Sequence, residues 1–331
     1  MADQSSQLAG ASAPSGAAID VTVREMVYRV PPLNQQDLDR NFGLATTNLL
    51  KWMQAARMDL PWMQPGYRAL GWLEPPMPRR LLVASQMVRL VRPGVLCEAV
   101  NSEVVTRCEV GSIGKTSIEF RYKIYFGEQL AGTGSTTMVV VSGEPGSLKP
   151  TPVPDVIRPL ADPVEGEDRA LLQKTLAAQP AKPPSSEGGD SSGAPWYRVG
   201  LSVRYSDEDV NKHANHSALA RFFEDAKETL AADPAAHPSL KALASQQIEA
   251  VLIAYAAEAR AEDLCEVRVA CGALPGALDM WVLRLAQNRW GNPPGLIGRG
   301  SLLCGGGPPQ SSEVLRTRLS SLATSSIAAR L

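Results

Sequence analysis

The sequence lacks the closely spaced cysteines and histidines that bind zinc or form disulfide frameworks. Its five cysteines are scattered without a CxxC pair, and an odd number cannot form a complete set of disulfides. This usage favours a reducing compartment, and we predict neither a metal nor another cofactor. No apolar run approaches the about 20 residues that a membrane-spanning helix needs. Residues 1–18 lack the basic and apolar regions of a secretory signal, so we expect a soluble, intracellular protein.

The sequence also has almost no net charge. Lys and Arg total 33 against 34 Asp and Glu, which gives a formal net charge of −1. Such a chain has no overall field to attract nucleic acid, so we predict no nucleic-acid partner. Hydrophobic residues make up 44% and charged residues 20%, as in soluble globular proteins, and 331 residues are enough for two domains.

Stretches of small and polar residues divide the chain into two comparable halves. Residues 1–18 are predicted to be disordered, and the Pro, Ser and Gly content before residue 196 predicts a linker over 161–195. The remaining segments are a first domain at 19–160, a second domain at 196–287, and an irregular Gly/Pro-rich segment and tail at 288–331.

An internal repeat relates the two halves at an offset of 170 residues. The acidic motif at 37–41 aligns with the motif at 207–211, and the same offset matches apolar positions at helical spacing: Leu49 with Leu219, Trp52 with Phe222, Met53 with Phe223, and Ala56 with Ala226. This spacing predicts an amphipathic helix after each motif.

Strand patterns follow each predicted helix. In the first half, apolar residues alternate with polar ones over 117–126, and similar β-rich runs lie at 82–91, 96–110 and 133–141. In the second half, a helix at 217–231 precedes strands at 248–257, 265–270 and 278–286. This order predicts an α+β fold in which an antiparallel sheet packs on one long helix, once in each half.

The pattern degrades after the last of these strands. Residues 288–310 contain seven glycines and four prolines. Where the last two strands should pair, we therefore expect a long loop or a defect in the underlying sequence.

The segment from Tyr205 to His216 is the richest in groups that can carry chemistry. It contains two of the three histidines beside carboxylates and carboxamides, directly before a predicted helix. One interpretation is a solvated loop that ends in a cap residue, Asn215 or Ser217. The other is a catalytic site, because a helix N-terminus offers N–H groups to an oxyanion while carboxylate and histidine activate water and transfer protons.

A metal site is a further alternative for this segment. Asp209, His213 and His216 are possible ligands there. Zinc needs three or four protein ligands, and the remaining histidine, His237, stands among alanine and proline, so the pattern does not favour a metal.

The run from Asp209 to Asn215 has the pattern Asp-x-Asn-x-His-x-Asn. With the aromatic helix after it, this run resembles the signature of plant and bacterial acyl-acyl carrier protein thioesterases, in the superfamily that also holds 4-hydroxybenzoyl-CoA thioesterase. The first half is similar through 110–117 and 130–134. The resemblance implies tandem hotdog domains, in which an antiparallel sheet wraps around a long central helix, twice. It covers residues 20–158 well and 196–286 less closely.

The resemblance assigns catalysis to the second half. Asp209, Asn211 and His213 match the Asp, Asn and His of the family motif. The family's later Tyr-x-x-Glu-Cys pattern is similar to the run from Tyr255, which keeps the carboxylate as Glu258 and has Ala259 in place of the cysteine. A mechanism that needs this thiolate is therefore excluded. The alternative for Glu258 is a solvent-facing strand carboxylate.

The first copy of the motif departs further from the family. It keeps Asp39 but has Gly43 where the second copy has His213, so Asp39 is only a minor catalytic candidate. The resemblance implies that the first domain mainly shapes the acyl pocket. Candidates for substrate binding are Asn215, Phe222, Trp52 and Met53, although helical spacing also fits the aromatic positions and Met53 as ordinary core residues.

We therefore expect a thioester hydrolase that releases fatty acid from acyl carrier protein (ACP) or from coenzyme A. In this hypothesis Asp209 is nucleophile or general base, His213 transfers protons, Asn211 orients, and Glu258 positions water. A non-catalytic acyl-thioester-binding protein and a hotdog hydratase are the alternatives.

The assembly and compartment are less specified by the sequence. A monomer or a homodimer of double-hotdog chains is expected, because one chain supplies two hotdog units. The terminal Ala329-Arg330-Leu331 resembles a peroxisomal address, with an accidental chain end as the alternative, while the family resemblance favours a plastid.

Overall fold

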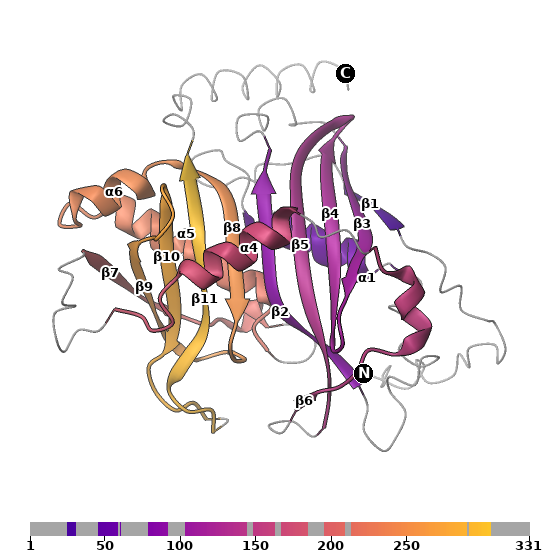
Figure 1. Ribbon diagram of the computed structural model, residues 1–331. Helices are drawn as coiled ribbons and strands as arrows, with labels where there is room; N and C mark the ends of the chain where they lie inside the picture. Colours follow the sequence, from indigo (N-terminus) through magenta and orange to yellow (C-terminus); the bar gives the residue numbers. More distant parts are fainter. Residues whose placement is uncertain are drawn as a thin grey trace, which may run out of the picture.

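One antiparallel sheet organises the computed structural model, as Figure 1 shows. The structure describes residues 25–30, 46–58, 60, 79–91, 103–143, 148–162, 167–184, 195–208, 213–289 and 291–305. The segment predicted to be disordered, 1–18, and the terminal Ala329-Arg330-Leu331 lie outside these residues. The elements of the first half are β1 (Glu25–Val30), α1 (Thr46–Met58), β2 (Arg79–Leu90), β3 (Val104–Ile113), β4 (Ser117–Phe126), β5 (Gln129–Ser142), β6 (Lys149–Pro150) and the 3-10 helix η3 (Asp155–Leu160).

The second half repeats this order after a connecting helix. Its elements are α4 (Glu167–Ala178), β7 (Trp196–Ser202), the 3-10 helix η4 (Tyr205–Asp207), α5 (His216–Ala232), α6 (Pro238–Ala244), β8 (Gln247–Tyr255), β9 (Leu264–Cys271), β10 (Ala277–Arg284) and β11 (Gly295–Gly305). The predicted helices and antiparallel strands are confirmed to within a few residues wherever they fall in the described part of the chain, whereas the helices α4 and α6 and the strand β7 were not predicted. None of the described helices is long and apolar enough to cross a membrane.

The strand order is the same in both halves when it is counted from the outer edge inwards. It runs β1-β3-β4-β5-β2 in the first half and β7-β9-β10-β11-β8 in the second half. The second strand of each half, β2 or β8, therefore lies at the centre of the sheet. There β2 and β8 pair antiparallel, with Gln86 opposite Ile253 and Val88 opposite Val251. The two halves thus form one continuous sheet (Figure 1).

The helices α1 and α5 lie on one face of the sheet, and α4 crosses the opposite face (Figure 1). Residues of α1, α5 and both halves of the sheet form one apolar core, in which Leu49, Met53, Phe222 and Phe223 are buried. The apolar stripes that the repeat predicts are therefore the faces that both helices turn to the sheet.

Glycines let both helices approach the sheet closely at equivalent strands. A Cβ atom on Gly134 of β5 would lie 2.8 Å from Cε of Met53, and a Cβ on Gly300 of β11 would lie 2.8 Å from Cε2 of Phe223. Met53 and Phe223 are the pair that the offset of 170 residues aligns. The two halves are therefore similar in packing as well as in sequence, because each helix contacts a glycine of the fifth strand of its half.

The prediction of an irregular segment from residue 288 is wrong for β11. This strand pairs with β8 on one side and with β10 on the other, inside the second half of the sheet. Its glycines weaken the strand pattern in the sequence, but they leave room for α5, because Gly298 meets Leu219 and Gly300 meets Phe223. The remaining predicted tail, 306–331, lies outside the described residues.

The predicted linker at 161–195 contains a helix that binds both halves. Arg169 of α4 donates a hydrogen bond to the Ser112 hydroxyl in the first half. Gln179, just after α4, donates a 2.8 Å hydrogen bond to the carbonyl of Gly300 in the second half. Between these ends, Leu172 is buried in a small apolar cluster with Met87 of β2 and Leu252 of β8. The linker therefore covers the outer face of the central strands.

The close contact of α5 with β11 predicts a large effect of a methyl group at Gly300. In Gly300→Ala the new Cβ would collide with the carbonyl oxygen of Leu252, a backbone atom that cannot move alone, and with Phe223. We expect a loss of about 3 kcal/mol of unfolding free energy, measured by urea denaturation. The control is Gly200→Ala in β7, where a Cβ meets nothing within 4 Å. Equal losses in the two variants would contradict this packing.

Candidate active site

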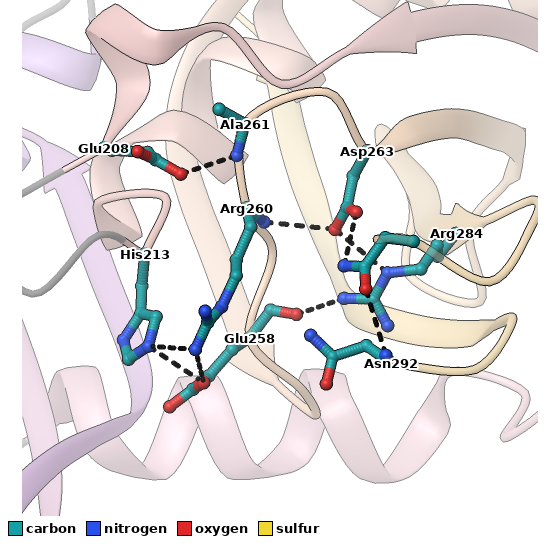
Figure 2. Close-up of polar contacts among 9 residues, drawn as sticks. Glu208, His213, Glu258, Arg260, Ala261, Asp263, Arg284 and Asn292 are labelled. Carbon is teal, nitrogen blue, oxygen red and sulfur yellow. Dashed lines mark hydrogen bonds and ion pairs between the residues drawn. The ribbon is translucent and has the colours of Figure 1, made fainter. Parts of the chain in front are cut away.

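The loop before α5 lies against the loop that follows β8. The Ala214 N–H donates a 2.7 Å hydrogen bond to the carbonyl of Ala259, and Ala214 also forms an isolated β-bridge with Glu208. The Glu208 carboxylate accepts a 2.7 Å hydrogen bond from the Ala261 N–H (Figure 2). These contacts bring two polar segments of the second half together at the N-terminus of α5.

Three side chains from these loops point toward one another in Figure 2. Nε2 of His213 lies 3.1 Å from Oε2 of Glu258 and 3.1 Å from Nη2 of Arg260, and the last two atoms are 3.9 Å apart. The side chains of His213, Glu258 and Arg260 are 25%, 42% and 24% exposed, so a substrate can reach them.

The position of the proton on the His213 ring depends on whether Nε2 bonds to Glu258 or to Arg260. Nε2 of a neutral histidine carries either one proton or one lone pair, so it can donate to Glu258 or accept from Arg260 but cannot do both. A change of partner is therefore a change of tautomer. This arrangement suits a group that passes protons to and from a reacting molecule.

A buried ion pair holds the loop that carries Glu258 and Arg260. Nε of Arg284 lies 2.9 Å from Oδ2 of Asp263, and these side chains are 4% and 0% exposed. Asp263 also accepts hydrogen bonds from the Arg260 N–H at 3.0 Å and from the Asn288 side chain at 2.7 Å. Arg284 in turn donates to the backbone carbonyl of Glu258. The pair therefore positions both partners of His213 through the backbone (Figure 2).

Asn215 determines where α5 begins. It is the N-cap residue, and its side-chain oxygen accepts a 3.2 Å hydrogen bond from the Ser217 N–H. Its own N–H donates to the carbonyl of Asp207 at 2.6 Å. The first turn of α5, with the positive end of its dipole, therefore starts just after the loop that carries His213.

His216 differs from His213 in its surroundings. Its Nε2 atom is enclosed and has no hydrogen-bond partner among the described residues. Burial, with a smaller effect of the nearby Arg57 charge, lowers the pKa of His216 to about 3. This imidazole is therefore neutral at neutral pH. Within the described ranges, no three His, Cys, Asp or Glu side chains converge to hold a metal ion.

Comparisons with known proteins identify the architecture. No protein-family model matches the sequence, and neither does any curated protein. A 12:0-ACP thioesterase from Umbellularia californica matches the structure with a TM-score of 0.55 and 14% identity, over 83% of this chain and 96% of that one. An acyl-ACP thioesterase from Bacteroides thetaiotaomicron matches with a TM-score of 0.56 and 13% identity, over 85% and 98%. The chain therefore shares its overall fold with these two structures.

This fold brings together two of the four predicted catalytic residues. His213 and Glu258 come from different loops and are within hydrogen-bond distance. Asp209 and Asn211 lie outside the described residues, as does the minor candidate Asp39, so their catalytic roles stay predictions. The alternative of a solvent-facing strand carboxylate for Glu258 is wrong about the strand, because the residue follows β8 in a loop. Its side chain is 42% exposed and contacts His213 and Arg260, and its catalytic role stays a prediction.

The predicted substrate-binding residues lie at two kinds of position. Trp52, Met53 and Phe222 are 7%, 0% and 0% exposed, in the core between the two helices and the sheet. Asn215 is partly buried at the start of α5, where its amide nitrogen donates to Oε1 of Gln54 at 3.3 Å. Their roles in binding stay predictions.

Sequence reasoning missed three residues of this site. Arg260 lies two residues after Glu258, and that proximity is the one signal that could have identified it. Asp263 and Arg284 are far apart in sequence, and the pairing of β9 with β10, which sets Arg284 opposite Cys265, brings them together. No local sequence pattern predicts that contact.

The lowered pKa of His216 predicts a loss of stability in mild acid. The unfolded chain binds a proton at this residue below about pH 6.5, whereas the folded chain does not until about pH 3, so stability falls as the pH drops between these values. We expect about 2 kcal/mol less stability at pH 5 than at pH 7 from this residue, measured by urea unfolding. His216→Asn should flatten the profile, whereas His237→Asn, which keeps a good N-cap on α6, should not.

The buried pair below the site predicts a second stability effect. Arg284→Met leaves the Asp263 carboxylate buried without its cation, so we expect a loss of about 3–5 kcal/mol in urea unfolding. Arg289→Met is the control, because it breaks an ion pair with Glu262 whose side chains are 50% and 51% exposed, and water screens such a surface pair, so the loss should be far smaller. Similar losses in both variants would refute the organising role of Arg284.

Proposed function

We propose that this protein is a tandem hotdog hydrolase of fatty acyl thioesters. The repeated strand order of the two halves supports the tandem arrangement. The observation that carries the proposal is the solvent-accessible cluster of His213, Glu258 and Arg260 beside the N-terminus of α5. The two similar structures described above are both thioesterases, which supports the same reaction type for this site.

Hydrolysis of a thioester consumes one water and yields a carboxylic acid and a thiol. In the proposed mechanism, the thioester carbonyl faces the first turn of α5, whose N–H groups stabilise the negative charge that develops on its oxygen. Asp209 has one of two roles: it attacks the thioester carbonyl and forms a mixed anhydride that water then hydrolyses, or it activates the water that attacks the carbonyl directly. In both routes the C–S bond breaks, Asn211 orients the reacting groups and Glu258 positions the water. His213 carries the proton that the water loses to the departing thiolate.

Arg260 has a supporting part in this mechanism. It lies near both Glu258 and His213, so it fixes the carboxylate and offers the imidazole a second partner. While Nε2 of His213 donates to Glu258, its other ring nitrogen carries the lone pair that a base needs. The three side chains together therefore allow the imidazole to act first as base and then as acid.

The proposed substrates are fatty acyl thioesters of ACP or of coenzyme A. The first half shapes the acyl pocket in this proposal, and the active unit is a monomer or a homodimer of such chains. The decisive experiment is the release of free thiol from medium- to long-chain acyl-CoA and acyl-ACP substrates, with Asp209→Asn in parallel. The preferred carrier in this panel distinguishes the two substrate classes.

Glu258→Gln provides the test of the cluster. Loss of the negative charge removes the group that positions water, so we expect kcat to fall about 100-fold or more. Because Glu258 is 42% exposed, the unfolding midpoint should change little. The matched control is Glu262→Gln in the same loop, whose carboxylate faces Tyr205 and Arg289 instead, and which should keep full activity.

Equal turnover of both variants and the wild type would reject the cluster as the site of hydrolysis. A folded wild-type protein that binds acyl ligand and releases no thiol from any member of the panel would reject the hydrolase itself, and would leave a non-catalytic acyl-thioester-binding protein.

A further inference from the structure

The N-terminus of each central helix contacts a side chain from the interior of the other helix. Oε1 of Glu224, on α5, accepts hydrogen bonds from both the backbone N–H and the hydroxyl of Thr46, each at 2.5 Å. Oε2 of Glu224 accepts from the hydroxyl of Thr47 at 3.0 Å. A carboxylate of α5 therefore occupies the first turn of α1.

The reciprocal contact involves a neutral side chain. Near the start of α5, Asn215 donates its 3.3 Å hydrogen bond to Oε1 of Gln54, on α1. Gln54 and Glu224 are equivalent positions, because they are related by the same offset of 170 residues as the helices themselves. The helices run antiparallel, so each start lies beside the middle of the other helix, as in an isologous dimer contact.

This exchange makes the two helix ends electrostatically different. A helix N-terminus carries about half a positive charge, which a carboxylate within hydrogen-bond distance offsets. Glu224 does this at α1, whereas the amide of Gln54 brings no charge to α5. The Asp207 carboxylate also lies near α5, but it forms a 2.6 Å ion pair with Arg221 and accepts from the Arg204 N–H.

We propose that Gln54 and Glu224 determine which of the two helix N-termini accepts the thioester carbonyl. Glu224 closes the α1 end to an oxyanion, because the oxyanion would meet a like charge beside the Thr46 N–H that Glu224 already binds. Gln54 keeps the α5 end electropositive because it is uncharged, so the first half contributes a neutral side chain beside the site of the second half. This inference rests on the proposed hydrolase function.

The test places a carboxylate at the α5 end. In Gln54→Glu, a negative charge near the developing oxyanion should lower kcat about 10- to 100-fold, with KM within about threefold, because the repulsion grows as charge develops on the oxygen. Gln54→Met removes the hydrogen bond to Asn215 without adding charge, and should keep kcat within about threefold of the wild type.

Thermal unfolding separates this effect from damage to the fold. A carboxylate stabilises a helix N-terminus, so Gln54→Glu should unfold at the same temperature as Gln54→Met or higher, while being the less active of the two. Glu224→Gln should show the opposite pattern. It should unfold at a lower temperature, because α1 loses its ionic cap, and it should keep wild-type thiol release, because Gly43 replaces the histidine in the first half.

The readout is thiol release from the best acyl-CoA or acyl-ACP substrate of the wild type. Wild-type kcat in Gln54→Glu would overturn the inference, and so would equal loss in Gln54→Met, which would assign Gln54 a packing role. A wild type that releases no thiol from any substrate gives a different result, because it rejects the hydrolase function on which the inference rests.

Discussion

Hydrogen bonding between β2 and β8 is the interaction on which the rest of the structure depends. It joins the second strand of each half, so the sheets of the two halves become one and neither central strand keeps an open edge. Because each helix is packed on the sheet of its own half, this pairing also places α1 and α5 antiparallel on the same face. The start of α5, where the proposed chemistry occurs, lies beside Gln54 for this reason.

The two halves share their topology but not their chemistry. The fifth strand of each half has a glycine under the central helix, at Gly134 and at Gly300, and both helices turn equivalent apolar residues to the sheet. The polar groups diverge on this common frame. The end of α1 is capped by Glu224, whereas the end of α5 faces a glutamine and a loop that carries His213. The repeat therefore provides a scaffold, and the two halves differ in the polar side chains of their loops and helix ends.

Much of the fold was predictable because its signals are periodic and local. Alternation over β4 and helical spacing over α1 and α5 identify each element, since one face of each must be buried. β11 could not be predicted in this way. Its glycines give no alternating pattern, and their purpose, the close approach of Leu219 and Phe223, appears only when α5 lies on the sheet. The α4 helix was not predicted for a related reason. Its apolar side packs on the outer face of strands from both halves, and that surface exists only in the folded protein.

The sequence by itself determined the two-part α+β plan, the helices that follow each acidic motif, and the candidacy of His213 and Glu258 through a family resemblance. Short-range patterns suffice for such inferences, since neighbours in the chain carry them. Only the tertiary structure decided that Arg260 completes the cluster, that Asp263 and Arg284 hold its loop, and that Glu224 caps α1 while Gln54 faces α5. Each of these contacts depends on strand register or helix packing between distant segments, which no local pattern specifies.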